Sequence, residues 1–189
     1  MPAVPLPVAV LDANVLYPQF MRDVLLRLAV AEIFRPRWTE QIHDEWTRNV
    51  LADRPDIPPD RIARVRQLMD LTFPEARVKN YRGLKHRFAG VHPGDRHVAA
   101  AALASGAGFI VTRNLRHFPA SALARFSIRA IDPDPFIARF LARDPVTVRA
   151  VLEQHREGLQ KPALDPDQYR AAFVTSGLHL SAEGLGDLE

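Results

Sequence analysis

The sequence predicts an α/β fold in which helices cover both faces of a parallel sheet. Three short apolar runs are typical of buried strands, at 8–11, at 109–112 and around Ile128. Segments with helical spacing of apolar residues separate them, and this alternation is typical of a parallel sheet. The chain has 189 residues, of which 47% are hydrophobic, so we expect one ordinary domain with a proper core, or one domain with an appendage.

Helical periodicity begins soon after the first strand. In the segment 19–31, Phe20, Val24 and Leu28 recur at the spacing of one helix face. The basic segment 75–93 has no such period, and we expect it to be irregular. The other helices predicted before Asp132 lie at 39–52, from about Asp60 to Leu71, from Gly94 or Asp95 to Gly106 or Gly108, and after Pro119.

The character of the chain changes after Asp132. No strand pattern follows, and Asp-Pro pairs separate three segments that favour helices, near 134–142, 145–160 and 166–177. We therefore predict two parts, an α/β domain over residues 1–132 and a helical C-terminal extension over residues 133–189.

Composition excludes several classes of chemistry. The chain contains no cysteine, so disulfides, thiolate zinc sites and cysteine nucleophiles are excluded. A reducing compartment suits this composition, and the N-terminal stretch lacks the basic and long apolar regions of a signal peptide. Apolar runs are also too short for a membrane span. We expect a cytoplasmic protein with no membrane association.

Charge is unevenly distributed, although the net charge is only +3. Between Arg77 and Arg96 there are six basic residues and one acid, whereas the segment 162–189 carries five acids and Arg170 as its one base. The basic stretch has two interpretations, a contact surface for a polyanion or a solvated loop, and charge alone favours the solvated loop.

Polar residues gather where the predicted strands end. Asp12 follows the strand at 8–11, and Thr112 and Asn114 follow the strand at 109–112. Asp95 begins the helix that leads into that strand, which places it at the same edge of the sheet. Ligands bind at this carboxyl edge in parallel α/β sheets. The alternative for Asp95 is a plain helix cap.

The helix over 39–52, with Thr39 as its cap, offers one acid that faces inward. Ile42, Trp46 and Val50 form its apolar stripe. Glu45 lies roughly 100° from the centre of that stripe, while the other two acids, Glu40 and Asp44, lie roughly 120° and 160° away. Glu45 is therefore the best placed to reach the sheet edge, and the alternative is a solvated surface residue.

Together, Asp12, Glu45 and Asp95 would place three carboxylates in one cleft. Carboxylates so close repel one another unless their pKa values rise or a cation binds. Mg²⁺ or Mn²⁺ prefers oxygen ligands of this kind, activates water and offsets charge on a phosphate. Acids that converge beside a basic surface thus indicate a phosphodiester substrate.

The stretches VLDANVL, HDEW and GDRHVAAAALASGAGFIVTRNLRHFP, in this order, resemble the PIN-domain ribonucleases, and most of all the bacterial VapC-type toxins. The resemblance covers about residues 8–132, and the helical tail looks like the extension carried by a subset of these toxins. It implies a PIN-like three-layer α/β/α fold with a mainly parallel sheet. It further implies an endoribonuclease dependent on Mg²⁺ or Mn²⁺, which forms a homodimer and is blocked by a cognate antitoxin.

The resemblance also assigns residues. Asp12, Glu45 and Asp95 match the acidic positions that hold the metal, and with Asn114 they make up the catalytic set. Asn14 and Thr112 match polar positions near the site and join the candidates for contact with RNA. Charge and position, rather than the resemblance, add three arginines as candidates for contact with RNA phosphates: Arg96, Arg113 and Arg116.

One departure from the family keeps an alternative open. Many relatives have an aspartate at the position of His117, and some have one in place of Asn114, so the sequence offers no obvious fourth carboxylate. A degenerate PIN module that binds RNA or a protein without cleavage is the alternative function. A zinc site is not indicated, because His86, His92 and His97 lack a regular ligand spacing.

Overall fold

The computed structural model describes residues 5–160 and 162–186, and within them it contains a four-stranded parallel sheet. The strand order is β2-β1-β3-β4. The strands are β1 (Val8–Leu11), β2 (Arg35–Arg37), β3 (Phe109–Val111) and β4 (Arg129–Ile131). Outside the described residues lie 1–4, 161 and 187–189. They include the start of the predicted α/β domain, the end of the predicted C-terminal extension and the last acids of the C-terminal stretch.

Ten α-helices accompany the strands within the described ranges, most of them at the predicted places. They are α1 (Ala13–Leu16), α2 (Gln19–Val30), α3 (Glu40–Asp53), α4 (Pro59–Thr72), α5 (Arg96–Ser105), α6 (Ala120–Leu123), α7 (Pro133–Arg143), α8 (Pro145–Gly158), α9 (Pro166–Thr175) and α10 (His179–Leu185). The sequence did not predict α1, α10 or β2. The basic segment expected to be irregular contains the short 3-10 helix η1 (Arg82–Phe88).

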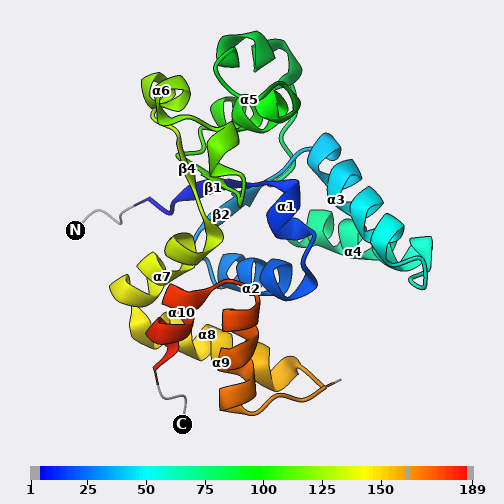
Figure 1. Ribbon diagram of the computed structural model, residues 1–189, viewed down its shortest axis with the longest axis vertical. Coiled ribbons are helices and arrows are strands. Elements are labelled where there is room, and N and C mark those ends of the chain that lie inside the picture. The colour runs from blue at the N-terminus through cyan, green and yellow to red at the C-terminus, as the bar shows by residue number, and fades with distance from the viewer. Residues whose placement is uncertain (1–4, 161, 187–189) are drawn as a thin grey trace.

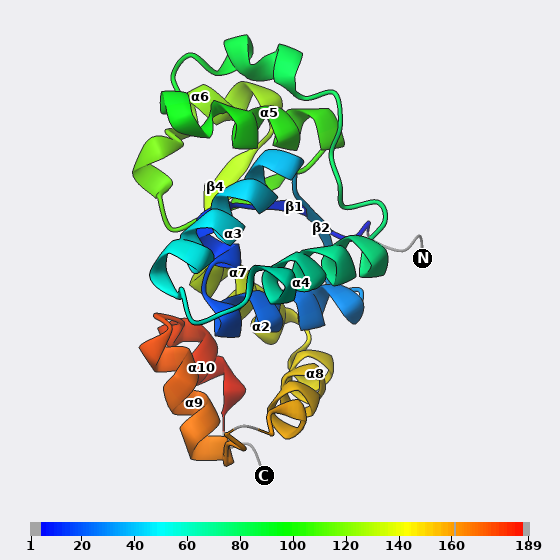
Figure 2. The ribbon, with the colours of Figure 1, turned by 90° about the vertical axis from the view of Figure 1, so that its right-hand side faces the viewer.

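Helices cover both faces of the sheet, which confirms the predicted three-layer α/β/α class. In Figure 1, α5 and α6 lie above the sheet and α2 and α7 lie below it, and Figure 2 shows the same layers from the side. Helix α5 contacts β1, β2 and β3, while α2 contacts β2. Helices α8, α9 and α10 lie farther from the sheet, beneath α2 and α7.

Small side chains let α5 approach the sheet closely. The run from Ala99 to Ala102 is fully buried, so this helix packs through methyl groups and backbone. Gly106 ends it with φ 65°, a left-handed conformation that glycine adopts without steric cost. Because β3 starts three residues later, this turn sets where the carboxyl end of that strand emerges.

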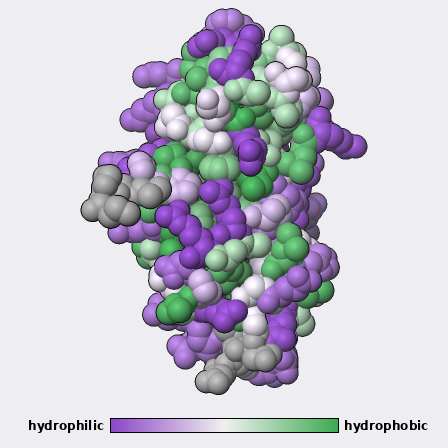
Figure 3. Space-filling model, turned by 90° about the vertical axis from the view of Figure 1, so that its left-hand side faces the viewer, coloured by the Kyte–Doolittle hydropathy of each residue, from purple (hydrophilic) through white to green (hydrophobic). Residues whose placement is uncertain are grey.

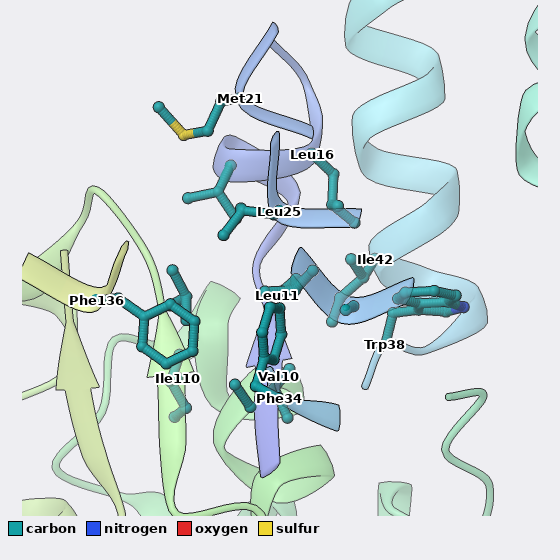
Figure 4. Close-up of a cluster of buried hydrophobic side chains, with 14 of the residues drawn as sticks. Val10, Leu11, Leu16, Met21, Leu25, Phe34, Trp38, Ile42, Ile110 and Phe136 are labelled. Atoms are coloured by element: carbon teal, nitrogen blue, oxygen red, sulfur yellow. The ribbon is translucent and has the colours of Figure 1, made fainter. Parts of the chain in front are cut away.

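Apolar side chains of the central strands meet those of α2 and α7 in one core. Figure 4 shows Val10, Leu11 and Ile110 of the strands beside Leu25 of α2 and Phe136 of α7. All of these are fully buried. Strand residues buried on both faces are typical of parallel sheets.

The core continues across the predicted boundary at residue 132. Phe136 of α7 packs against Phe34, with ring centroids 5.1 Å apart. Farther along, Phe173 of α9 meets Phe20 of α2 edge to face at 5.3 Å, and Tyr169 lies at 5.8 Å from the same ring. The C-terminal helices therefore share one hydrophobic core with the sheet.

Arg113 ties the ends of two strands to the C-terminal helices. It follows β3, and its guanidinium donates to both carboxylate oxygens of Asp132, after β4, at 2.9 and 3.0 Å. The same group donates to the carbonyl of Ser176, after α9, at 2.7 Å. A charged donor shared in this way fixes the C-terminal helices against the sheet edge.

Hydrophilic and hydrophobic side chains are interspersed over the face drawn in Figure 3, outside the grey residues. Among the described residues, no helix is both long and apolar enough to cross a membrane.

The N-terminus of α10 is held by Asp134 of α7. This carboxylate is 7% exposed and accepts from the backbone N–H of Leu180 at 2.9 Å and of Ser181 at 2.8 Å. The hydroxyl of Ser181 also donates to it at 2.8 Å. An acceptor on another helix thus satisfies the first N–H groups of α10.

We predict that Asp134→Ala lowers the free energy of unfolding by about 2–3 kcal/mol, because buried N–H groups lose a charged acceptor. Urea denaturation measures this, and hydrogen exchange should locate the loss in α10. Asp167→Ala, an exposed acid in the first turn of α9, is the control and should change stability by less than about 0.5 kcal/mol. Equal effects of the two variants would contradict this role.

Candidate active site

The site lies at the point where the strand order reverses. Strand β1 is followed along the chain by its neighbour β2 on one side, while its other neighbour is β3. Asp12 follows β1 and Thr112 follows β3. The carboxyl ends of strands at such a switch point are where open α/β sheets bind ligands.

Asp12 is buried, with 3% of its surface exposed, and is held by several donors. The N–H of Ala13 donates to Oδ1 at 2.8 Å, which caps α1. The Thr112 hydroxyl and the Asn14 amide each donate to Oδ2 at 2.7 Å. These bonds fix the carboxylate in a single orientation.

Asn14 and Thr112 support Asp12 and each other. The Asn14 amide also donates to the Thr112 oxygen at 2.9 Å, and the Asn14 carbonyl accepts the N–H of Arg113 at 3.0 Å. The Thr112 oxygen accepts the N–H of Asn114 at 3.0 Å. Asn14 and Thr112, both among the residues predicted to contact RNA, therefore position Asp12. Their hydrogen bonds also join the segments that follow β1 and β3.

Burial raises the pKa of Asp12 above the ordinary value for an aspartate. The hydrogen bonds from Thr112 and Ala13 oppose this shift without cancelling it, and the nearby charge of Asp95 adds to it. Without a bound cation, the folded protein therefore disfavours the ionised form of Asp12.

Glu45 lies on α3 where the helical period predicted it. Ile42, Trp46 and Val50 are buried and Asp44 is exposed, while Glu45 is half-buried. Thr39 caps the helix by accepting the N–H of Ile42 at 3.1 Å, as expected.

His97 of α5 orients Glu45. Its Nε2 lies 3.2 Å from Glu45 Oε1, and the amide of Gln41 donates to the same oxygen at 3.1 Å. Burial alone would raise the pKa of Glu45, but the contacts with His97 and Gln41 bring it below its ordinary value. Glu45 is therefore ionised more readily than Asp12. Sequence reasoning did not single out His97 for this contact, because it joins two helices far apart in the chain.

One cavity of about 420 Å³ brings the three predicted acids together. Asp12, Glu45 and Asp95 line it, with Asn14 and Asn114 beside them. Its other lining residues are Ala13, Tyr17, Arg48, Asn49 and Asp53. The carboxylates thus converge from β1, α3 and the start of α5.

Asp53 is a fourth carboxylate that the sequence analysis missed. It ends α3 and accepts the Tyr17 hydroxyl at 2.8 Å at the mouth of the cavity. The signal was its position eight residues after Glu45, which is about 80° around the helix from it and therefore on the same side of α3. Arg48 and Asn49 lie between them on that face and are both exposed.

A larger cavity of about 630 Å³ lies between α3 and α4, but its acids already have partners. Glu40 pairs with Arg66 and Arg77. Asp70 accepts from the indole of Trp38 at 2.8 Å and lies 3.1 Å from Nε2 of His43. That cavity is lined by two carboxylates, whereas four carboxylates line the cavity at the sheet edge.

Asp95 does not cap α5 with its side chain, although it holds the cap position. Its Oδ2 lies 3.0 Å from Nδ1 of His92 and 2.9 Å from Nδ1 of His117. His117, the residue that departs from the family pattern, therefore contacts one of the predicted metal ligands.

The three arginines proposed for RNA contact do not line the cavity. Arg96 donates to the carbonyls of Val91 at 3.1 Å and Ala89 at 3.0 Å, and Arg113 is bonded to Asp132. Arg116 is exposed in the turn after β3. Of the arginines near the sheet edge, Arg48 is the one that reaches the cavity.

Oxygen dominates the donor set of the cavity, which suits Mg²⁺ or Mn²⁺. Carboxylates of Asp12, Glu45, Asp53 and Asp95 and the amide oxygens of Asn49 and Asn114 are the ligands these ions prefer. The cavity also has room for the waters that Mg²⁺ retains. A cation there would relieve the strain of ionising the buried Asp12.

Comparison with known proteins gives two partial matches. The family model described as the VapC50 C-terminal domain matches residues 133–187. A stretch of 46 residues is 52% identical to a protein of Mycobacterium tuberculosis (strain ATCC 25618 / H37Rv) that is designated provisionally as ribonuclease VapC50. That stretch covers 24% of this chain and 27% of the length of the relative. The chain is VapC-like over these stretches. No solved structure matches it.

The raised pKa of Asp12 predicts a pH-dependent effect of Asp12→Asn. The native state keeps the Asp12 proton at pH values above about 3.9, where an unfolded chain releases it, so this residue lowers wild-type stability as pH rises through that window. Asparagine does not titrate. In EDTA, the stability of Asp12→Asn relative to wild type should therefore increase from pH 3.5 to pH 7. Urea unfolding at several pH values measures it, and a flat difference contradicts the assignment.

Proposed function

We propose that the protein is an endoribonuclease that depends on Mg²⁺ or Mn²⁺ and hydrolyses RNA phosphodiester bonds. One observation carries the proposal. Four carboxylates, those of Asp12, Glu45, Asp53 and Asp95, line one open cavity at the switch point of a parallel sheet. The partial identity to a relative designated as a ribonuclease supports the same reaction.

Asp12, Glu45 and Asp95 would hold the metal ion, with Asp53 as a further ligand or as the acceptor for Tyr17 at the cavity mouth. When bound, such an ion lowers the pKa of a water molecule and offsets the charge of the phosphate.

The residues of the chain supply orientation. Thr112 and Ala13 hold Asp12 in one position, and His97 holds Glu45 in its ionised form. Asn114 lines the cavity with its amide available to bind water or a phosphate oxygen. Arg48, exposed at the rim, and Arg116, exposed beyond it, would contact the RNA backbone.

We further propose that the protein is the toxin of a toxin–antitoxin pair, acts in the cytoplasm and forms a homodimer. The similarity of residues 133–187 to the VapC50 C-terminal domain supports this biological role, as does the resemblance of the α/β part to VapC-type toxins. The partner would be a cognate antitoxin that blocks the acidic cavity.

We predict that Glu45→Gln reduces RNA cleavage more than about 100-fold, because an ion ligand is lost. The same loss is expected for Asp12→Asn and Asp95→Asn, and EDTA should abolish cleavage. Gel assays on single-stranded and structured RNA with Mg²⁺ or Mn²⁺ measure the rates.

Asp44→Asn is the matched control for Glu45→Gln. Asp44 is the adjacent residue on α3 but points to solvent, where it pairs with Arg66 at 2.8 Å. This variant should cleave at the wild-type rate. Undiminished cleavage by Asp12→Asn would overturn the mechanism, and RNA binding by the wild type without any cleavage would favour the alternative of a degenerate binding module.

Expression of the wild-type chain in a bacterium without the antitoxin should arrest growth, because uncontrolled RNA cleavage stops translation. Asp12→Asn should leave growth unaffected at the same protein level, and Asp44→Asn should arrest it. Growth curves and quantitative immunoblots test this. Harmless expression of a protein that is active on RNA in vitro would contradict the toxin role and leave the nuclease activity standing.

A further inference from the structure

Two histidines from separate segments meet at one carboxylate beside the cavity. The Nδ1 atoms of His92 and His117 lie 3.0 and 2.9 Å from the same oxygen, Oδ2 of Asp95. The two rings are stacked, with centroids 4.4 Å apart and planes at 18°. All three ligand atoms lie within 4.8 Å of one another.

The backbone holds this cluster together. The N–H of His92 donates to the carbonyl of His117 at 3.0 Å, and the N–H of Asp95 donates to the carbonyl of His92 at 2.9 Å. Gly94 faces the His92 ring, because a Cβ there would lie 3.4 Å from Nδ1. This distance is an ordinary van der Waals contact, so Gly94 packs directly beside the Nδ1 edge of the ring.

Hydrogen bonding alone fixes the tautomer of both rings. For both rings to donate to Oδ2, each must carry a proton on Nδ1. If both rings were imidazolium, their charges would repel at this separation. In the other tautomer, the Nδ1 lone pairs of two neutral rings and the Asp95 carboxylate offer three ligand atoms to one cation.

The distances suit a metal ion. Ligand atoms that are about 2.1 Å from a common ion lie about 3.0–3.4 Å apart, depending on the coordination geometry. The two contacts to Asp95, at 3.0 and 2.9 Å, lie at and just below the lower limit of this range. The His92 side chain is 53% exposed and the His117 side chain 23%, which gives an ion access from solvent.

We propose that His92, Asp95 and His117 bind a divalent transition-metal ion of the Zn²⁺ class, at a position distinct from the oxygen-rich cavity. Imidazole ligands favour such ions over Mg²⁺, and two histidines with one carboxylate leave coordination positions for water. Asp95 is the one residue common to both positions. The proposal does not depend on nuclease activity.

The sequence spacing did not show this site. His92 and Asp95 are three residues apart, but His117 lies beyond α5 and β3, and only the fold brings it back to them. The zinc site considered from His86, His92 and His97 is not formed, because His86 contacts the carbonyl of Gly83 and His97 contacts Glu45.

Calorimetric titration of the full chain with ZnCl₂, after removal of any histidine tag, tests the proposal. We expect one Zn²⁺ to bind per chain at this site. His92→Ala, at an exposed position, should weaken the affinity at least about tenfold, and His92→Ala/His117→Ala should abolish it. With Co²⁺ as the probe, the visible absorption of a cobalt–imidazole complex should appear in the wild type and disappear in the double variant.

Two variants separate the sites. His86→Ala, which removes an exposed histidine of the same segment, should bind Zn²⁺ like the wild type, and so should Asp12→Asn. Absence of Zn²⁺ binding by the wild type would overturn the proposal. So would equal affinity of the wild type and the folded double variant, checked by circular dichroism, or loss of Zn²⁺ in Asp12→Asn with retention in His92→Ala.

Discussion

The placement of a buried carboxylate at the end of a parallel strand is the constraint on which the site depends. Asp12 comes directly after the apolar residues of β1, and its surroundings remove it from water. The fold compensates with the N–H of Ala13 and the hydroxyl of Thr112. These donors directly follow the ends of β1 and β3. The pairing of the two strands therefore determines the orientation of the Asp12 carboxylate.

Compensation is incomplete, and this has a functional meaning. Burial raises the pKa of Asp12, and the nearby charge of Asp95 adds to the shift, so the folded chain disfavours the ionised form of this acid. Helices α3 and α5 contribute Glu45 and Asp95 to the same cavity. A protein selected for stability alone has no reason to gather like charges, and sites that do so are typical of function.

Sequence reasoning found what local patterns encode. Periodicity placed Glu45 inward, and strand ends placed Asp12 and Thr112 at one edge. It missed β2, whose Arg-Pro-Arg sequence has no apolar pattern and pairs only as an edge strand. It assigned Arg113 to RNA by charge, whereas long-range packing gave that guanidinium to Asp132. Such pairings depend on tertiary contacts, which spacing along one chain does not contain.

The bonds of Arg113 make the cavity and the C-terminal helices one mechanical unit. Three hydrogen bonds join Ser176 to Asp12. The Arg113 guanidinium donates to the carbonyl of Ser176, the backbone N–H of Arg113 donates to the Asn14 side chain, and the Asn14 amide donates to Asp12. The end of α9 and the buried acid are therefore joined through a continuous set of hydrogen bonds and the side chains of Arg113 and Asn14. The C-terminal helices, which look like an appendage in the sequence, therefore support the sheet edge at which the candidate site lies.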